Sequence, residues 1–274
     1  MMLKIKKRLM EFFEEDVPFW DVTFVPRKKV EAEIISKSSG VLAGIEVAKI
    51  GFEMFNVDVV ESLKDGDRIR AGDVLMRVIG DSEKLFSFER TILNILMRMS
   101  GIATATAELL KLARSVNEKV IIAGTRKTTP GFRIFEKMAI EIGGGDPHRF
   151  SLSDCVLIKR NHIIVAGGLI EAIRFAKERS SFTKKIEVEI SRPEEAILVA
   201  KEGVDAVMLD NFSVDEVEKT MNLLREERID VLVEVSGGIT PENVVAYAKS
   251  GVDVISSGYI THSSKALDFS LRVL

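Results

Sequence analysis

Short apolar runs rich in β-branched residues recur along the second part of the chain, separated by segments with helical spacing of apolar positions. The runs cover residues 119–123, 155–159, 185–190, 204–210, 230–236 and 252–257. Runs of this length that alternate with helical segments are typical of buried parallel strands, each followed by a crossover helix. Six such units predict a parallel α/β barrel.

Helices are expected in the gaps between these runs, after Gly168, Pro193, Ser213 and Pro241. The clearest start signal is at the last of them. Thr240 is a residue type that caps helices, and Pro241 suits the first helical position because its ring fixes φ and its missing N–H is not needed there. We therefore predict a helix that begins at Pro241 with Thr240 as its N-cap.

The pattern before residue 119 is different. Residues 30–47 and 57–79 read as strands separated by glycine turns, and residues 86–96 read as a helix. Residues 63–75 also resemble the lipoyl and biotinyl carrier sandwich, but they contain no Met-Lys-Met or Asp-Lys-Ala tripeptide for the modified lysine. We therefore interpret this part as a separate α+β domain with a β-turn scaffold rather than a carrier.

Composition narrows the class of protein. The 274 residues include 39 basic and 42 acidic side chains, so a net charge of -3 offers no long-range attraction to nucleic acid or to an anionic membrane. The single cysteine, Cys155, excludes an intrachain disulfide, and a core thiol is favoured over a nucleophile. Neither a signal peptide nor a run of 18 apolar residues is present, which predicts a soluble cytoplasmic protein.

Polar residues gather where the predicted barrel strands end. They are Thr125, Arg126, Lys127, Lys159, Glu189, Asp210, Asn211, Ser236, Gly237, Gly238, Ser257 and Gly258. Catalytic groups of α/β barrels lie at the carboxyl ends of the strands. Because a buried charge must be paired or costs several kcal/mol, charges at successive strand ends favour an active site over a structural role.

Two acids at these ends suit a hard cation. Glu187 and Glu189 share a face of one strand, but only Glu189 is near its end, so Glu187 is expected to be a deeper, paired residue. Glu189 and Asp210, with no histidine beside them, suit Mg²⁺ bound with a diphosphate rather than zinc. For Glu234, a catalytic role and a role as partner of a buried Lys or Arg remain open.

Positive charge is concentrated beside these acids, in Arg126, Lys127, Arg149 and Lys159 with His148. Guanidinium groups bind carboxylates and phosphates through two parallel hydrogen bonds, so the substrate should carry several negative charges. A glycosidase also uses two carboxylates but would not need these cations. The glycine-containing strand ends 236–238 and 257–258 offer backbone N–H groups to phosphate, and residues 143–145 could approach a ligand or form a turn.

These residues together resemble the quinolinate phosphoribosyltransferase family over nearly the whole chain. The matching motifs are Glu15-Asp16, Asp21-Val22-Thr23, Glu89-Arg90-Thr91, Asn94, Ser100-Gly101-Ile102-Ala103-Thr104, Thr125-Arg126-Lys127-Thr128-Thr129-Pro130-Gly131, Arg133, Glu136-Lys137, Gly143-Gly144-Gly145, His148-Arg149, Leu157-Ile158-Lys159, Asn161-His162, Glu187-Val188-Glu189, Leu209-Asp210-Asn211, Glu234, Ser236-Gly237-Gly238-Ile239 and Thr261-His262-Ser263.

The resemblance implies an open parallel α/β barrel with an N-terminal α/β sandwich domain. The sandwich would span residues 1–105 with the C-terminal segment 265–274, and the barrel would span residues 106–264. It also implies a Mg²⁺-dependent enzyme of NAD biosynthesis that converts quinolinate and phosphoribosyl pyrophosphate to nicotinate mononucleotide, pyrophosphate and CO₂. The implied assembly is a homodimer with shared active sites, with a hexamer of three dimers as an alternative.

The resemblance also implies a role for each matched position. Arg126, Lys127, His148, Arg149 and Lys159 would bind the quinolinate carboxylates, Glu189 and Asp210 would serve Mg²⁺ and the ribose, Ser236, Gly237, Gly238, Ser257 and Gly258 would hold the 5-phosphate, and Arg90 would reach in from the neighbouring subunit. Gly124, Pro147, Arg160 and Trp20 depart from the family's usual Asp, Asn, Asp and Gly. The first three adjoin the expected substrate ligands and therefore bear on the choice of pyridine substrate.

Three other functions were weighed. A molybdenum-transport-associated paralogue shares the barrel and the Thr-Arg-Lys motif, but Arg133, the Glu136-Lys137 pair and the Asn161-His162 pair argue against it. Nicotinate phosphoribosyltransferase would bind a monocarboxylate and need fewer cations. A non-catalytic binding or carrier module would not need the acid pair of Glu189 and Asp210.

Overall fold

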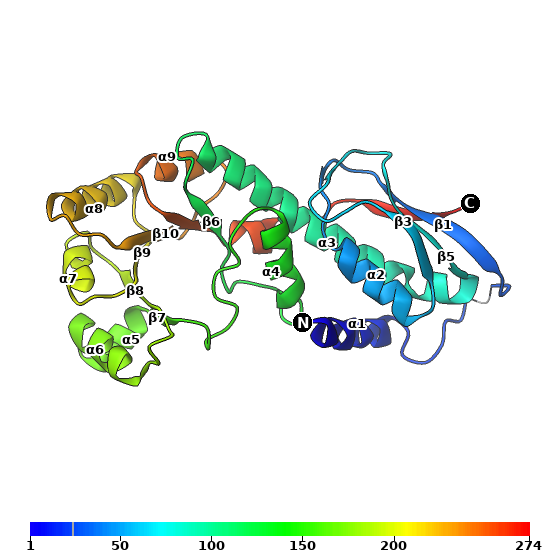
Figure 1. The fold of residues 1–274 in the computed structure, drawn as a ribbon, viewed down its shortest axis with the longest axis horizontal. Helices are drawn as coiled ribbons and strands as arrows, with labels where there is room; N and C mark the ends of the chain where they lie inside the picture. Colours follow the sequence, from blue (N-terminus) through cyan, green and yellow to red (C-terminus); the bar gives the residue numbers. More distant parts are fainter. Residues whose placement is uncertain (24) are drawn as a thin grey trace. The chain divides into compact units, whose positions relative to one another are not determined.

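The computed structural model describes residues 1–23 and 25–274, which form two compact units (Figure 1). One unit contains Met1–Ala107, Thr129–Gly144 and Ser264–Leu274, and the other contains Glu108–Thr128 and Gly145–Ser263. Residues 129–144, which the boundaries given above place in the barrel domain, group with the first unit. Among the described residues, no helix is long and apolar enough to span a membrane.

The second unit contains one six-stranded parallel sheet, and each strand falls within a predicted run. The strands are β6 (Ile121–Ala123), β7 (Val156–Ile158), β8 (Ile186–Ile190), β9 (Ala206–Asp210), β10 (Leu232–Ser236) and β11 (Val254–Ser256). Their order is β6-β11-β10-β9-β8-β7, so β6 and β7 are the two edges. The barrel is therefore open, as the family resemblance implied.

Helices connect these strands and lie on the outer side of the sheet (Figure 1). They are α5 (Arg160–Ala166), α6 (Leu169–Arg179), α7 (Glu195–Lys201), α8 (Val214–Glu226) and α9 (Val244–Lys249). The start of α8 agrees with the prediction because the Ser213 hydroxyl accepts a hydrogen bond from the Glu216 N–H, while the Glu216 carboxylate binds the Ser213 N–H. This reciprocal capping box satisfies two N–H groups that the helix itself cannot.

The predicted first residue of α9, Pro241, was wrong. Residues 241–243 form a turn, and α9 begins at Val244. The Asn243 side chain accepts a hydrogen bond from the Thr240 N–H at 2.9 Å and donates one to the Gly238 carbonyl at 2.9 Å. Such local side-chain bonds compete with the helical backbone pattern, and here they keep the segment out of the helix.

The first unit is built on an antiparallel sheet of order β12-β1-β5-β3. Its strands are β1 (Lys29–Ser36), β3 (Asp58–Ser62), β5 (Val74–Asp81) and β12 (Phe269–Val273), and β2 (Gly40–Val41) and β4 (Arg68–Ile69) form a separate two-stranded ladder. The helices of the unit are α1 (Met2–Asp16), α2 (Ile45–Met54), α3 (Ser82–Arg114) and α4 (Arg133–Ile142). Only the residues of α3 up to Ala107 belong to this unit. The C-terminal strand β12 joins β1, in agreement with the expected return of the C-terminus to this domain.

Two local predictions in this unit differ from the structure in their bounds. The segment expected to be extended as far as Val47 turns helical at Ile45, because the distant Asp65 carboxylate accepts hydrogen bonds from the Gly44 and Ile45 N–H groups at 2.7 and 2.8 Å. The predicted helix 86–96 is confirmed, but it is only part of the N-terminal half of the 33-residue helix α3. In both cases long-range packing extends a helix beyond its local signals.

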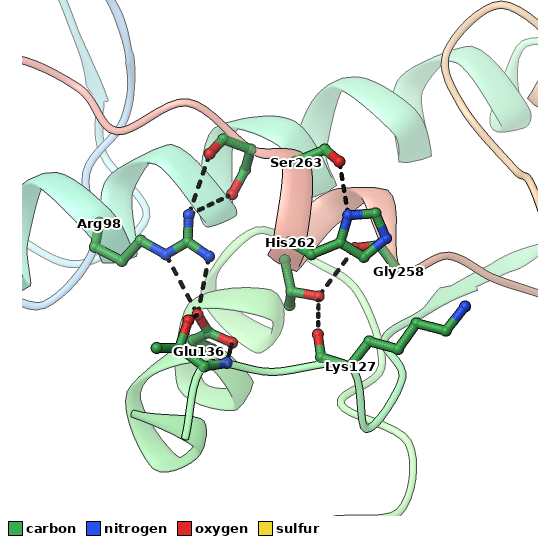
Figure 2. A network of polar contacts seen from close by, with 9 residues as sticks. Arg98, Lys127, Glu136, Gly258, His262 and Ser263 are labelled. Carbon is green, nitrogen blue, oxygen red and sulfur yellow. Dashed lines mark hydrogen bonds and ion pairs between the residues drawn. The ribbon is translucent and has the colours of Figure 1, made fainter. Parts of the chain in front are cut away.

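A buried ion pair links the three chain segments of the first unit (Figure 2). Glu136 on α4 is fully buried, and its Oε1 lies 2.9 Å from Nη2 of Arg98 on α3. Arg98 also donates to the Ser264 carbonyl at 3.1 Å, and the Thr129 hydroxyl donates to Glu136 at 3.0 Å. Removal of one partner would leave an uncompensated buried charge, so this contact explains why the three segments pack as one unit.

Candidate active site

A pocket of ≈ 640 Å³ lies in the barrel unit, lined by residues from the carboxyl ends of the strands. Of the sequence-predicted site residues, it brings together Arg126, Lys127, His148, Arg149, Lys159, Glu189, Asp210, Ser236, Gly237, Gly238 and Gly258. These residues come from chain segments that lie far apart in sequence. The parallel register of the sheet brings their strand ends to one edge.

Three cations of this pocket have no acidic partner. Arg126, Lys127 and Arg149 form no ion pair with any carboxylate in the described part of the chain. The Nε atom of Arg126 is buried without a hydrogen-bond partner. A buried donor that is left unpaired is costly, so the pocket is suited to an anion with several acceptor oxygens.

The loop after β6 is held firmly. The Lys127 N–H donates to the Thr125 hydroxyl at 3.0 Å, and the Lys127 carbonyl accepts from the Thr261 hydroxyl at 2.8 Å (Figure 2). The same hydroxyl lies 3.0 Å from the Gly258 carbonyl. The backbone of Lys127 is thereby fixed, while its side chain extends towards Gly258, whose Cβ position would lie 3.1 Å from Lys127 Cδ.

Three acids line the pocket, and two of them, Glu189 and Asp210, lie near each other. Lys159 Nζ forms an ion pair of 2.6 Å with Glu189 Oε2, and Asn211 donates to Asp210 Oδ2 at 2.8 Å. Burial in the first place, and the charge of Glu189 in the second, raise the pKa of the Asp210 carboxyl. A divalent cation would relieve this repulsion, and carboxylate oxygens are the ligands that Mg²⁺ prefers. The residues present therefore fit such an ion.

The glycine loop after β10 needs its glycines. Gly237 and Gly238 have φ values of +100° and +63°, and a Cβ on Gly237 would lie 2.3 Å from Asn211 Oδ1. A Cβ on Gly258 would lie 2.9 Å from Nε2 of His262. Larger side chains would therefore clash with neighbouring pocket residues. Both loops line the pocket, where their backbone can approach a phosphate.

Ser257 departs from its expected place. It is buried and does not line the pocket, because its N–H donates to the Ala123 carbonyl at 2.9 Å and its hydroxyl to the Ile239 carbonyl at 2.7 Å. Ser257 therefore supports the loop rather than offering a group to phosphate. The neighbouring Ser256 lines the pocket instead, and its buried hydroxyl has no hydrogen-bond partner.

Other pocket residues were missed by sequence reasoning. Tyr259, His262 and Ser263 belong to a short π-helix, Tyr259–Ser263, and the His262 ring accepts or donates a 2.6 Å hydrogen bond with the Ser263 hydroxyl (Figure 2). π-Helical turns are rare and frequent at functional sites. The motif Thr261-His262-Ser263 was among the matched motifs and could have indicated these residues, but the sequence analysis assigned no role to His262.

His148 lines the pocket among the predicted substrate ligands. Its Nε2 atom also lies 3.1 Å from Glu234 and 3.6 Å from Glu187. The partner of Glu234 is thus a histidine rather than a lysine or arginine. Burial, together with the nearby charge of Glu234, raises the pKa of Glu187 to about 8, which agrees with the expectation of a deeper residue.

Arg90 and Gly143, two other residues named from the sequence, belong to the first unit. Arg90 is exposed on α3 and forms no ion pair with the described residues, although its charge partly offsets the rise that burial causes in the pKa of the adjacent Glu89 carboxyl. Gly143 of the triple-glycine motif packs on α3, since its Cβ position lies 2.6 Å from the Ala103 carbonyl oxygen. The glycines of residues 143–145 are not in the pocket wall.

An open α/β barrel whose strand ends carry unpaired cations, two acids and two glycine loops defines a barrel enzyme that acts on an anionic substrate. Family models described as "Quinolinate phosphoribosyl transferase, N-terminal domain" and "Quinolinate phosphoribosyl transferase, C-terminal domain" match residues 19–100 and 102–272. The chain belongs to the quinolinate phosphoribosyltransferase family.

Individual relatives support this membership along the whole chain. A probable nicotinate-nucleotide pyrophosphorylase (carboxylating) of Archaeoglobus fulgidus is 58% identical over 94% of this chain and 100% of its own length. The human nicotinate-nucleotide pyrophosphorylase (carboxylating) is 41% identical over 89% of this chain and 82% of its own. The solved structure of the nicotinate-nucleotide pyrophosphorylase from Francisella tularensis has a TM-score of 0.93 at 34% identity, covering 100% of this chain and 97% of that one.

Proposed function

We propose that the barrel pocket transfers the phosphoribosyl group of phosphoribosyl pyrophosphate to quinolinate, releasing pyrophosphate and CO₂ and forming nicotinate mononucleotide for NAD biosynthesis. The observation that carries the proposal is the presence of Arg126, Lys127 and Arg149 in one pocket without acidic partners. A dicarboxylate and a phosphorylated sugar supply the missing negative charge. The names of the relatives describe the same chemistry, as the pyrophosphorolysis of nicotinate nucleotide.

The cations of the pocket would orient the pyridine. Guanidinium groups of Arg126 and Arg149 bind carboxylates in a planar, bidentate manner, which would hold quinolinate with its ring nitrogen towards C1 of the ribose. The nitrogen attacks C1 as the bond to pyrophosphate breaks. The resulting pyridinium then accepts the electron pair of the C–CO₂ bond, and a proton replaces CO₂ on the ring.

The acids and glycine loops would hold the other substrate. Glu189 and Asp210 would bind Mg²⁺, which neutralises charge on the departing pyrophosphate. The loops with Gly237, Gly238 and Gly258 would hold the 5-phosphate through backbone N–H groups. Lys159, which now pairs with Glu189, would be released for an anionic substrate when the metal takes the carboxylate.

The proposal extends to assembly. Arg90 lies outside the barrel unit, is exposed and forms no salt bridge with a described carboxylate, which supports a role at a neighbouring subunit's site in a cytoplasmic homodimer with shared active sites. A hexamer of three dimers is the alternative assembly.

A turnover assay that compares quinolinate with nicotinate tests the function. With quinolinate, Mg²⁺ and phosphoribosyl pyrophosphate, we expect nicotinate mononucleotide and CO₂ in equal amounts. Nicotinate should react poorly, because a monocarboxylate leaves part of the cationic pocket unpaired. Faster turnover with nicotinate, or product without CO₂, would contradict the proposal. The comparison also tests whether Gly124 on the pocket wall, where the family usually has Asp, alters the choice of substrate.

Replacement of Arg126 or Arg149 by alanine should weaken quinolinate binding. Loss of a charged hydrogen bond costs roughly 1.5–3 kcal/mol, which corresponds to about a 10- to 150-fold rise in Kd measured by calorimetry. Binding of phosphoribosyl pyrophosphate should change less. Arg225→Ala, at an exposed position on α8, is the matched control and should bind both substrates normally. Unchanged quinolinate affinity in both pocket variants would exclude these arginines from the substrate site.

A further inference from the structure

A cluster of two acids and one histidine lies in the interior of the barrel. Glu187 on β8 is 6% exposed and Glu234 on β10 is 3% exposed. Their Oε2 atoms lie 3.6 and 3.1 Å from Nε2 of His148, and the Oε1 atom of each acid is buried without a hydrogen-bond partner. Buried carboxylates placed so close together are unfavourable, so this arrangement is retained at a cost to stability.

The hydrogen bonds of His148 indicate which ring nitrogen carries the proton. The Arg149 N–H donates to His148 Nδ1 at 2.7 Å. Because Nδ1 accepts this hydrogen bond, the geometry favours the tautomer whose N–H is at Nε2, directed at Glu234. In this tautomer His148 donates to Glu234.

The same geometry disfavours a metal ion. The ligand atoms of the three residues lie within 4.8 Å of one another, close enough for coordination. Metal-bound histidines, however, use one nitrogen for the ion and donate a proton from the other. Here Nδ1 accepts from the Arg149 N–H, an arrangement that favours a proton rather than a metal at Nε2.

His148 in turn fixes the backbone of the next residue. The φ angle of His148 is 55°, a left-handed conformation that is unusual outside glycine. Its own N–H donates to Asp146 Oδ1 at 2.6 Å, and its ring holds the amide of Arg149. These two hydrogen bonds together stabilise the left-handed backbone. Arg149, a cation of the substrate pocket, follows directly.

We propose that Glu234, supported by Glu187, is a positioning residue: it fixes the tautomer and orientation of His148, which fixes the backbone that presents Arg149 to the dicarboxylate. This inference rests on the proposed function. Glu234 acts on the pyridine half of the pocket alone, so its loss should affect quinolinate and leave phosphoribosyl pyrophosphate almost unaffected.

Two substitutions of Glu234 test the proposal. Glutamine at this position has a carbonyl that accepts from His148 and an amide that donates to Glu187, whereas leucine removes both bonds. We expect Glu234→Leu to raise KM for quinolinate roughly 10- to 100-fold, the range typical for loss of a residue that orients a ligand. KM for phosphoribosyl pyrophosphate should stay within about twofold, and Glu234→Gln should restore most of the quinolinate affinity. Glu218→Leu, at an exposed position on α8, controls for loss of an acid.

A spectroscopic measurement separates positioning from general damage. The chain has three histidines, His148, His162 and His262, so ¹⁵N spectra of histidine-labelled protein are simple to assign with His162→Gln and His262→Gln variants. We expect His148 in the Nε2–H tautomer in the wild type and in Glu234→Gln, but not in Glu234→Leu. If leucine prevents folding, as judged by thermal melting, Glu234→Ala takes its place.

The outcomes are distinct. A doubly protonated His148 or an Nδ1–H tautomer in the wild type would overturn the proposal, as would equal KM values for quinolinate in the leucine and glutamine variants. A wild-type protein that fails to turn over quinolinate would instead refute the proposed function. The tautomer measurement needs no substrate, so it would still decide the role of Glu234.

Discussion

Asp210→Ala is expected to lower kcat by roughly 10²- to 10³-fold, because loss of metal-assisted charge stabilisation costs several kcal/mol. The melting temperature should stay the same or rise. Burial and the charge of Glu189 raise the pKa of Asp210, so the ionised carboxylate is less favourable in the folded protein than in the unfolded chain near neutral pH. Its removal relieves that cost, a common exchange of stability for function.

Metal dependence provides the complementary measurement. Activity should need Mg²⁺ or Mn²⁺ and should collapse in Glu189→Ala as well. Asp215→Ala, at an exposed position in the first turn of α8, is the matched control and should remain fully active. Full turnover in excess chelator, or an Asp210→Ala enzyme with normal kcat, would refute the assignment of Glu189 and Asp210 to the metal.

Subunit mixing is expected to rescue two inactive enzymes. An Arg90→Ala subunit retains an intact barrel, and an Asp210→Ala subunit retains Arg90. If Arg90 serves a neighbouring subunit's site, a mixed dimer contains one complete site and one that lacks both residues. Denaturing and refolding equal amounts of the two variants together should restore about a quarter of wild-type activity, since half of randomly paired twofold dimers are mixed.

The mixing experiment needs a control that shows that mixed dimers have formed. Differently tagged subunits, captured in sequence on two resins, isolate the mixed species for assay. Mixed dimers without activity would place Arg90 in its own subunit's site or outside the active site. Refolding each variant alone should give no recovery, which shows that activity comes from pairing rather than from the refolding procedure.

Local patterns predicted the barrel well because each parallel strand is buried on both faces. An uninterrupted apolar run such as Val207 to Leu209 of β9 is a signal that does not depend on distant contacts. The same reasoning located the pocket, because polar residues directly after such runs meet at one edge of the sheet. Glu189, Asp210 and Lys159 were all found in this way.

What local patterns missed depends on partners far along the chain. The start of α2 is set by Asp65, 20 residues later, and the ring of His148 contacts Glu234, 86 residues later. Alternation along β10 could show that Glu234 faces the same way as Ser236, but not which side chain it would meet. Ser257 was misplaced for a related reason, because its hydroxyl is used by the Ile239 carbonyl of a neighbouring loop.

The pairing of the last strand with the first has a consequence for synthesis on the ribosome. The two strands are bridged by Arg272 and Glu33, which lie 239 residues apart. At roughly 5–20 residues per second, β1 is therefore made about 12–50 s before β12. During that interval β1 is an unprotected edge that can pair with other nascent chains. Fast overexpression should thus favour aggregation of unfinished chains, and truncation before Phe269 should leave this edge permanently open.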